Sequence, residues 1–324
     1  MFVSCFVIYT HFIALTTMMT TRKKKLWIYI KNIFKILITG AAIYWVSQKI
    51  SFAELKGALE KCNPLYLFLA LFSYGTSQLI ASSRLNSFLK VIGLHISERY
   101  NLRLYQVGLL YNFFLPGGIG GDGYKIYFLK KHYAIRGRRV LTAVFFDRLS
   151  GLWALSIITG CLIMFMPRLS IPNVVTVSVL IVGTATYLYF LQLFFKEFLS
   201  KFIITHLKAL AVQSFQTLSA IAILYALGFD GKFSPYLLIF LVSSLVAIVP
   251  SILGGAGLRE SLMAFGAEYF QLDPHLAVLV SLLFYIISLL VASSGLYYIL
   301  RPQRLGMNKL PSAEEVEEEL EKEE

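Results

Sequence analysis

Six long apolar stretches constrain this 324-residue chain more than any other feature of its sequence. They cover residues 26–47, 64–83, 140–166, 174–194, 209–228 and 276–299. A helix of about 20 apolar residues crosses the roughly 30 Å hydrocarbon core of a bilayer. Only 15% of the residues are charged, against about 25% in an ordinary soluble domain. The sequence therefore predicts an all-α, polytopic integral membrane protein with six full transmembrane helices, and it excludes a disordered or fibrous chain.

The two ends of the chain differ from this apolar body. Residues 1–21 are apolar and rich in Thr until they reach the basic run Arg22–Lys25, which is typical of a cytoplasmic segment before a first span. Two explanations of this extension stay open: translation starts near Met19, or the segment is peripheral to the fold. Residues 306–324 carry a run of glutamates, which predicts a solvated acidic tail in the cytoplasm.

The positions of the basic residues indicate how the chain is threaded. The formal net charge is +12, and the Lys and Arg residues are scattered between apolar runs, which favours a topology signal and attraction to anionic headgroups over nucleic-acid binding. If Arg22–Lys25 is cytoplasmic, the basic loops 84–103 and 130–139 share its side only when 104–129 dips into the membrane and returns. The same reasoning requires 236–271 to dip from the outer face. The sequence thus predicts two re-entrant hairpins that enter from opposite faces.

Both predicted hairpins turn at a proline followed by a glycine cluster. The turn residues are Pro116, Gly117, Gly118, Gly120 and Gly121 in the first hairpin, and Pro250, Gly254, Gly255 and Gly257 in the second. Non-helical backbone at bilayer depth persists only inside protein or beside water, so these turns should line an internal polar cavity. Similar broken segments in the halves 22–168 and 169–305 indicate the inverted repeat of a transporter. The alternative is that both are Gly-rich loops at helix ends.

Charged residues follow each glycine turn. Lys125 and Arg259, together with the helix N-termini expected after the turns, suit a phosphate or another anion. Asp122 and Glu260 can pair with these cations or hold a cationic headgroup. With Asn112 at the start of the first turn, these residues are candidate substrate-binding groups.

Of three further charges, two lie within a predicted span and one lies at the end of another. Asp147 and Arg148 are adjacent in 140–166, and structural and substrate-contacting roles stay equally open for them. Arg84 follows the last residue of the span 64–83, so we expect it to anchor that helix near the inner headgroups rather than to bind a ligand.

The sequence contains no motif that indicates a metal site or a cofactor site. The three cysteines and five histidines are scattered, and no HExxH, CxxC or ATP-binding motif occurs. We therefore expect no metal site, no cofactor and no enzymatic activity.

Three motifs in this order resemble the transmembrane region of the lysylphosphatidylglycerol synthetase/flippase family. They are Asn112 to Asp122 with its Leu-Pro-Gly-Gly-Ile-Gly-Gly core, Asp147–Arg148 with Gly151–Leu152, and Pro250 to Glu260 with its Gly-Gly-Ala-Gly-Leu-Arg core. The resemblance covers about residues 22–305 and implies a multi-pass protein of the inner (plasma) membrane, and the distribution of basic residues predicts a cytoplasmic C-terminus. The best-studied members move aminoacylated phosphatidylglycerol between leaflets and carry a soluble synthetase domain, and we do not expect the aminoacyl-transfer activity here.

The resulting expectation is a membrane lipid translocase for a lipid with a phosphate-containing headgroup. Its partners would be membrane phospholipids, and a homo-oligomer or a separate lipid-modifying enzyme stays open. Two alternatives remain: a transporter of a soluble or polyprenyl-linked anionic substrate, and an accessory membrane protein without transport activity.

Overall fold

Long helices and pairs of short helices form the part of the chain that the computed structural model describes. The described residues are 57, 60, 62–114, 120–133, 135–166, 169–246 and 258–305, and all their regular secondary structure is helical. This confirms the predicted all-α class. The N-terminal extension 1–21, the first predicted span 26–47 and the acidic tail 306–324 lie outside the described residues.

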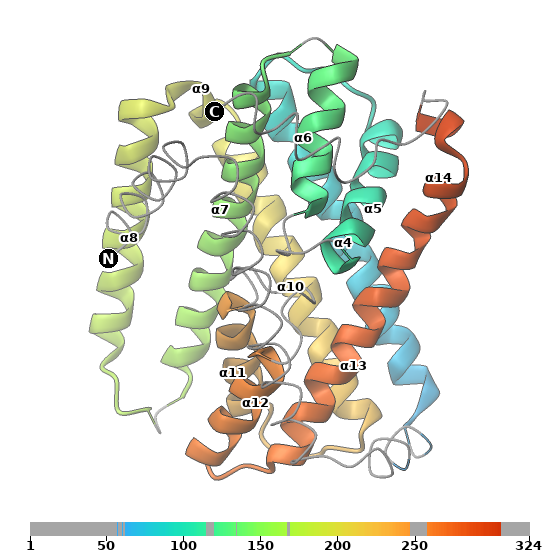
Figure 1. Ribbon diagram of the computed structural model, residues 1–324. Helices are drawn as coiled ribbons and strands as arrows, with labels where there is room; N and C mark the ends of the chain where they lie inside the picture. The colour runs from blue at the N-terminus through green and yellow to red at the C-terminus, as the bar shows by residue number, and fades with distance from the viewer. Residues whose placement is uncertain are drawn as a thin grey trace, which may run out of the picture.

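Five helices are long and apolar enough to cross a membrane. They are α4 (Pro64–Val91), α7 (Gly137–Met164), α8 (Asn173–Phe194), α10 (Phe202–Ala226) and α13 (Pro274–Ala292), which continues through η2 (Ser293–Gly295) into α14 (Leu296–Leu300). They correspond to the last five of the six predicted spans and run along the long dimension of the molecule (Figure 1). A short helix, α9 (Lys196–Leu199), joins α8 to α10, and η3 (Pro302–Leu305) follows α14.

Two pairs of shorter helices interrupt the series of long ones. The first pair is α5 (Glu98–Phe114) with α6 (Gly120–Tyr133), and the second is α11 (Phe233–Val246) with α12 (Leu258–Tyr269). At 1.5 Å per residue these helices are about 18–26 Å long, less than the bilayer core. The α5–α6 pair lies toward the end of the molecule where α4 ends, and the α11–α12 pair lies toward the opposite end (Figure 1).

The starts of two long helices follow the same local chemistry. Asn63 precedes Pro64 at the start of α4, and its side chain accepts a hydrogen bond from the Leu65 amide at 3.0 Å. Asp273 precedes Pro274 at the start of α13 and accepts from the His275 amide at 2.9 Å. A side-chain acceptor satisfies an amide that has no partner in the first turn, and proline has the helical φ without needing a donor.

The buried apolar residues divide into two main clusters. The first joins the last part of α4 to α5, α6 and the first part of α7, and includes Leu85, Phe128 and Phe146. The second joins the first part of α4 to α10, α11, α12 and α13, and includes Ile223 and Phe240. Each short-helix pair thus packs in its own core, and α4 contributes to both.

The helices α5 and α6 approach each other very closely at two glycines. A methyl group on Gly121 of α6 would overlap the carbonyl oxygen of Gly108 on α5. A methyl group on Gly108 would lie 2.8 Å from a side-chain carbon of Lys125. This crossing therefore requires glycine because backbone faces backbone.

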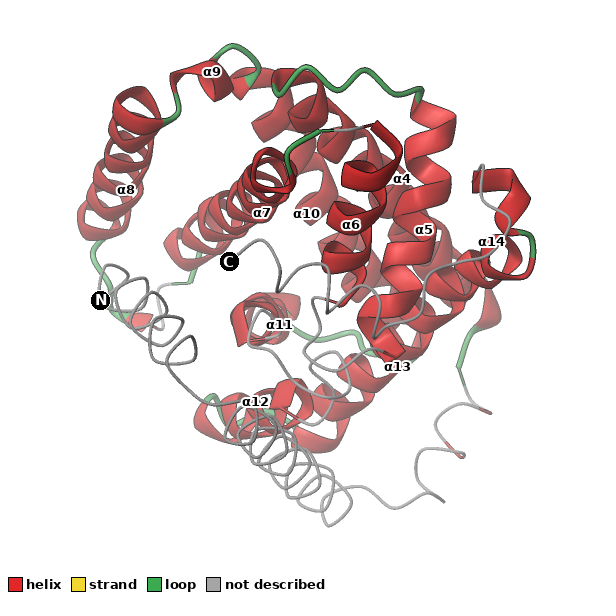
Figure 2. Ribbon diagram, turned by 45° about the horizontal axis from the view of Figure 1, so that its top comes forward, coloured by secondary structure: helices red, strands yellow, loops and turns green. Residues whose placement is uncertain are grey.

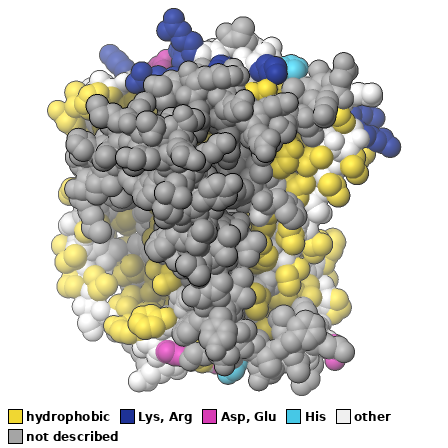
Figure 3. Space-filling view, viewed as in Figure 1, with side chains coloured by type: hydrophobic (Ala, Val, Ile, Leu, Met, Phe, Trp, Pro, Cys, Tyr) yellow, Lys and Arg dark blue, Asp and Glu magenta, His cyan; other side chains and the backbone are white. Residues whose placement is uncertain are grey.

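The outer surface suits a lipid environment. In α8 only 6% of the most apolar window is buried, and the helix lies at the edge of the bundle, beside α7 (Figure 2). Lysine and arginine side chains gather at the end of the molecule where α6 ends and α7 begins, and hydrophobic side chains cover the flanks between the ends (Figure 3). On this face (Figure 3), apolar side chains thus lie between the two ends, and basic side chains gather at one of them.

Candidate functional site

A cavity of about 570 Å³ lies among the long and short helices. Its lining residues come from the middle of α4, α7, α10 and α13 and from the ends of the short helices that face the predicted turns. All seven candidate substrate-binding residues line it: Asn112, Asp122, Lys125, Asp147, Arg148, Arg259 and Glu260. The structure therefore brings together polar and charged residues that are up to 148 positions apart in the sequence. Their role toward a substrate stays a prediction.

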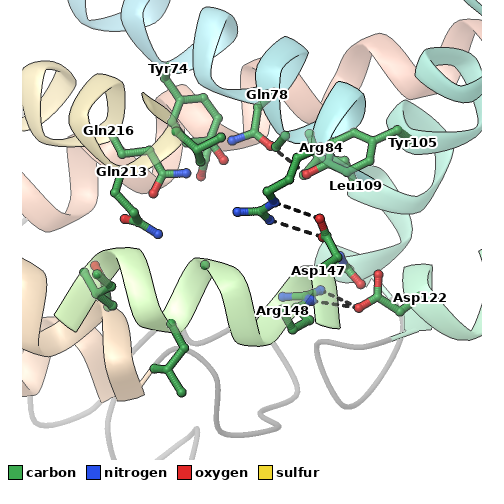
Figure 4. Close-up of a pocket in the computed structure, with 18 of the residues that line it drawn as sticks. Tyr74, Gln78, Arg84, Tyr105, Leu109, Asp122, Asp147, Arg148, Gln213 and Gln216 are labelled. Atoms are coloured by element: carbon green, nitrogen blue, oxygen red, sulfur yellow. Dashed lines mark hydrogen bonds and ion pairs between the residues drawn. The ribbon is translucent and has the colours of Figure 1, made fainter. Parts of the chain in front are cut away.

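Asp122 lies between two cations at the start of α6. Its Oδ1 atom is 2.6 Å from Lys125 Nζ, one turn further along the same helix. Its Oδ2 atom accepts from Arg148 Nε at 2.8 Å and lies 2.7 Å from Arg148 Nη2 (Figure 4). The Lys125 ammonium also lies 4.8 Å from the centre of the Tyr105 ring. Asp122 thus ties α6 to α7 by a charge-assisted fork.

Arg84 and Asp147 form a second, more deeply buried ion pair. Arg84 Nε donates to Asp147 Oδ1 at 2.7 Å and Arg84 Nη2 donates to Oδ2 at 3.2 Å (Figure 4). Both residues are 6% exposed. The expectation that Arg84 anchors the helix at the headgroups is therefore wrong: α4 continues to Val91, so Arg84 lies about two turns inside it.

The adjacent residues Asp147 and Arg148 form ion pairs with different helices. Consecutive side chains on a helix diverge by about 100°, so they leave α7 in different directions. Asp147 contacts Arg84 on α4, and Arg148 contacts Asp122 on α6. Both side chains hold neighbouring helices together where they border the cavity.

Arg259 and Glu260 occupy the first turn of α12. The Arg259 guanidinium lies against two aromatic rings that contact each other, 4.4 Å from the centre of Phe240 and 4.5 Å from that of Phe284, and donates to Ser244 Oγ at 3.3 Å. Glu260 accepts a hydrogen bond from Ser281 Oγ at 2.8 Å. This turn therefore presents a cation held by aromatic faces beside a buried carboxylate.

The first glycine turn is partly described. The Asn112 side chain accepts a hydrogen bond from the Gly121 amide at 2.9 Å, so it caps the beginning of α6. The helix after the second turn begins at Leu258, directly after the glycine cluster, as expected. The helix after the first turn begins earlier than expected: α6 starts at Gly120, so Gly120 and Gly121, predicted to belong to the turn, lie in its first helical turn. The other predicted turn residues lie outside the described residues: Pro116, Gly117, Gly118, Pro250, Gly254, Gly255 and Gly257.

One family matches most of the sequence. The match to the family described as the lysylphosphatidylglycerol synthase TM region covers residues 32–294. The chain belongs to this family. The matched range includes every residue of the ion-pair network and both short-helix pairs, so the cavity lies wholly within the family's lysylphosphatidylglycerol synthase TM region. No curated protein matches the chain.

In this lysylphosphatidylglycerol synthase TM region, one wall of the cavity is polar but uncharged, and the sequence pattern did not predict it. It contains Gln78 on α4 and Gln213 and Gln216 on α10 (Figure 4). Gln78 is held by Ser77 and Tyr105, whose hydroxyl donates to it at 3.3 Å. The available signal was the spacing of Gln213 and Gln216, which places two amides on one face of an apolar helix.

The donor set in the cavity suits anions better than metal ions. Among the described residues, no group of three or more His, Cys, Asp and Glu side chains has the arrangement of a metal site. The cavity instead holds four cationic side chains against three carboxylates. Cationic side chains can form charge-assisted hydrogen bonds with an anionic group.

Proposed function

We propose that the protein is a membrane lipid translocase that moves a lipid with a phosphate-containing headgroup between the leaflets. The observation that carries the proposal is the cavity at mid-length of the long helices, with its excess of cationic side chains. Charges inside a membrane protein are costly and typically mark a substrate pathway. A volume of about 570 Å³ is within the usual range for sites that enclose a small ligand.

The proposal includes six full spans and two re-entrant hairpins in an inverted repeat. Among the described residues, a long helix, a short-helix pair and another long helix follow one another twice: α4, α5–α6 and α7, and then α10, α11–α12 and α13. The two pairs lie toward opposite ends of the bundle (Figure 1), which supports entry from opposite faces. In such repeats the substrate site lies near the bilayer midplane, between the halves.

The basic end of the molecule sets the proposed orientation. Exposed Arg136, Arg138 and Arg139 lie at the start of α7. Exposed Lys196 is the first residue of α9, and exposed Lys201 follows that helix. Under the positive-inside rule this end faces the cytoplasm. Since α13 runs back to the same end, the C-terminus is proposed to be cytoplasmic, in the inner (plasma) membrane.

The proposed activity is transport without bond making or breaking, and the partners are membrane phospholipids. A transporter of a soluble or polyprenyl-linked anion would use the same cavity, and an accessory protein would not need it. Mass spectrometry of co-purified lipids distinguishes a translocase from these two alternatives, because a translocase should retain one lipid class above its abundance in the membrane. A homo-oligomer or a separate lipid-modifying enzyme stays a proposal for the cell.

Arg259→Ala and Asp122→Ala are each expected to lower lipid translocation at least about tenfold. Loss of one member of a desolvated, charge-assisted contact typically costs about 2–5 kcal/mol, and about 1.4 kcal/mol corresponds to a factor of ten. The measurement is dithionite quenching of a fluorescent phospholipid in proteoliposomes, with variants that elute as monodisperse protein. Arg139→Gln is the control, since Arg139 forms an exposed pair with Glu197 at 3.3 Å. Wild-type rates in both cavity variants would contradict the proposal.

A further inference from the structure

We infer that the cavity selects an anionic phosphodiester lipid whose headgroup carries hydroxyl groups, and that it rejects a headgroup ending in a free amine. The inference rests on the proposed function and names the substrate class of the same site. Three features of the cavity support it: its carboxylates already have hydrogen-bond partners, two of its arginines have donors without a partner among the described residues, and two amides on α10 face it.

The carboxylates of the cavity already accept hydrogen bonds from other side chains of the protein. Asp122 accepts from Lys125 and Arg148, and both of its oxygens are used. Asp147 is held through both oxygens by Arg84. Glu260 is 2% exposed and accepts from Ser281. An ammonium group entering the cavity would therefore compete with internal donors for every carboxylate, and it would meet an excess of like charge.

The cations, in contrast, retain unused donors. Arg84 Nη1 and Arg259 Nε are buried and have no hydrogen-bond partner among the described residues. A buried donor without an acceptor is unfavourable, and the two lie on guanidinium groups that line the same cavity. An anionic oxygen at either group would satisfy such a donor with a small shift of the side chain, which favours an anion in the cavity.

The side-chain amides of Gln213 and Gln216 can form hydrogen bonds with a neutral polar group. Their side chains project from α10 toward the cavity, across from Asp147 and Arg148 (Figure 4). Neither side chain makes a hydrogen bond or ring contact with another residue that the structure describes. A glutamine amide donates and accepts, as a hydroxyl group does, so two amides one turn apart fit a headgroup with several hydroxyls.

The test compares lipids that share one acyl chain and differ in the headgroup. Wild-type protein is reconstituted in phosphatidylcholine vesicles with a trace of acyl-labelled phosphatidylglycerol, phosphatidate or phosphatidylethanolamine, and dithionite quenching gives each rate. Phosphatidylglycerol should move at least about fivefold faster than phosphatidylethanolamine. In Gln213→Leu/Gln216→Leu, the ratio of phosphatidylglycerol to phosphatidate rates should fall about threefold to tenfold, the effect of losing one or two ordinary hydrogen bonds.

A matched control separates recognition from loss of a polar residue. Gln192→Leu makes the same replacement on α8, at an exposed position outside the cavity, and should keep the wild-type rate ratio. Equal wild-type rates for phosphatidylglycerol and phosphatidylethanolamine would overturn the inference and leave the translocase proposal standing. A rate ratio unchanged in the double variant would also overturn it. Failure of wild-type protein to move any labelled lipid would overturn the proposed function itself.

Discussion

Gly121→Ala is expected to prevent the native packing of α5 against α6 and to leave little folded protein. The added methyl group would overlap the Gly108 carbonyl oxygen, which belongs to the backbone of the facing helix. A flexible side chain can move away from such a clash, but a helix backbone moves only as a unit. Overpacking normally costs about 1–3 kcal/mol when side chains can adjust, and the cost is larger when they cannot. We expect the free energy of unfolding to fall by more than about 4 kcal/mol, which is exceptional for a single substitution.

The measurement is thermal unfolding in detergent, with size-exclusion chromatography to follow the folded fraction. Gly75→Ala is the matched control, because Gly75 lies inside α4 and a methyl group there would meet nothing within 4 Å. Alanine favours a helix over glycine by up to about 1 kcal/mol, so this variant should be as stable as the wild type or slightly more stable. A Gly121→Ala protein with the wild-type melting temperature would show that α5 and α6 do not cross this closely.

Asp147→Asn is expected to destabilise the protein by about 3–5 kcal/mol, because it leaves the buried Arg84 guanidinium without its counter-ion. Removing both charges should recover much of this loss, since the cost comes from an uncompensated buried charge rather than from a missing attraction. We therefore expect Arg84→Gln/Asp147→Asn to be more stable than Asp147→Asn alone. A double-mutant cycle on melting temperatures measures the coupling.

The pair Arg139–Glu197 offers a matched comparison at the surface. It also joins an arginine to a carboxylate, at 3.3 Å, but about half of each side chain is exposed. Exposed pairs contribute about 0–1 kcal/mol, so Glu197→Gln should change the melting temperature little. Equal losses in Asp147→Asn and Glu197→Gln would contradict the burial that gives the Arg84–Asp147 pair its importance.

The membrane-spanning architecture was readable from the sequence because it depends on local composition and length. Each of the last five predicted spans corresponds to a long helix, and α12 begins directly after the second glycine cluster, as expected. The error at Arg84 has the same origin: the end of an apolar run was taken as the end of a helix. Residues Arg84 to Val91 continue the helix because protein rather than lipid surrounds them, so their polarity does not end it.

The seven candidate residues could be named from the sequence because charges and glycine turns are unusual among apolar spans. Their pairing could not, because it depends on which helix faces which. Arg148 lies next to Asp147 in the chain but contacts Asp122, and Arg84 reaches Asp147 across 63 positions. The uncharged wall was missed for a related reason, since a glutamine in a span carries no charge to mark it.

The sequence by itself determined the helical class, the positions of the described spans and the residue types available for an anionic ligand, because hydropathy, glycine and charge act locally along the chain. Only the tertiary structure decided that these residues share one cavity, that its carboxylates are already engaged and that two amides on α10 face it. Those properties depend on contacts between helices far apart in the chain, and such contacts arise only when the helices pack.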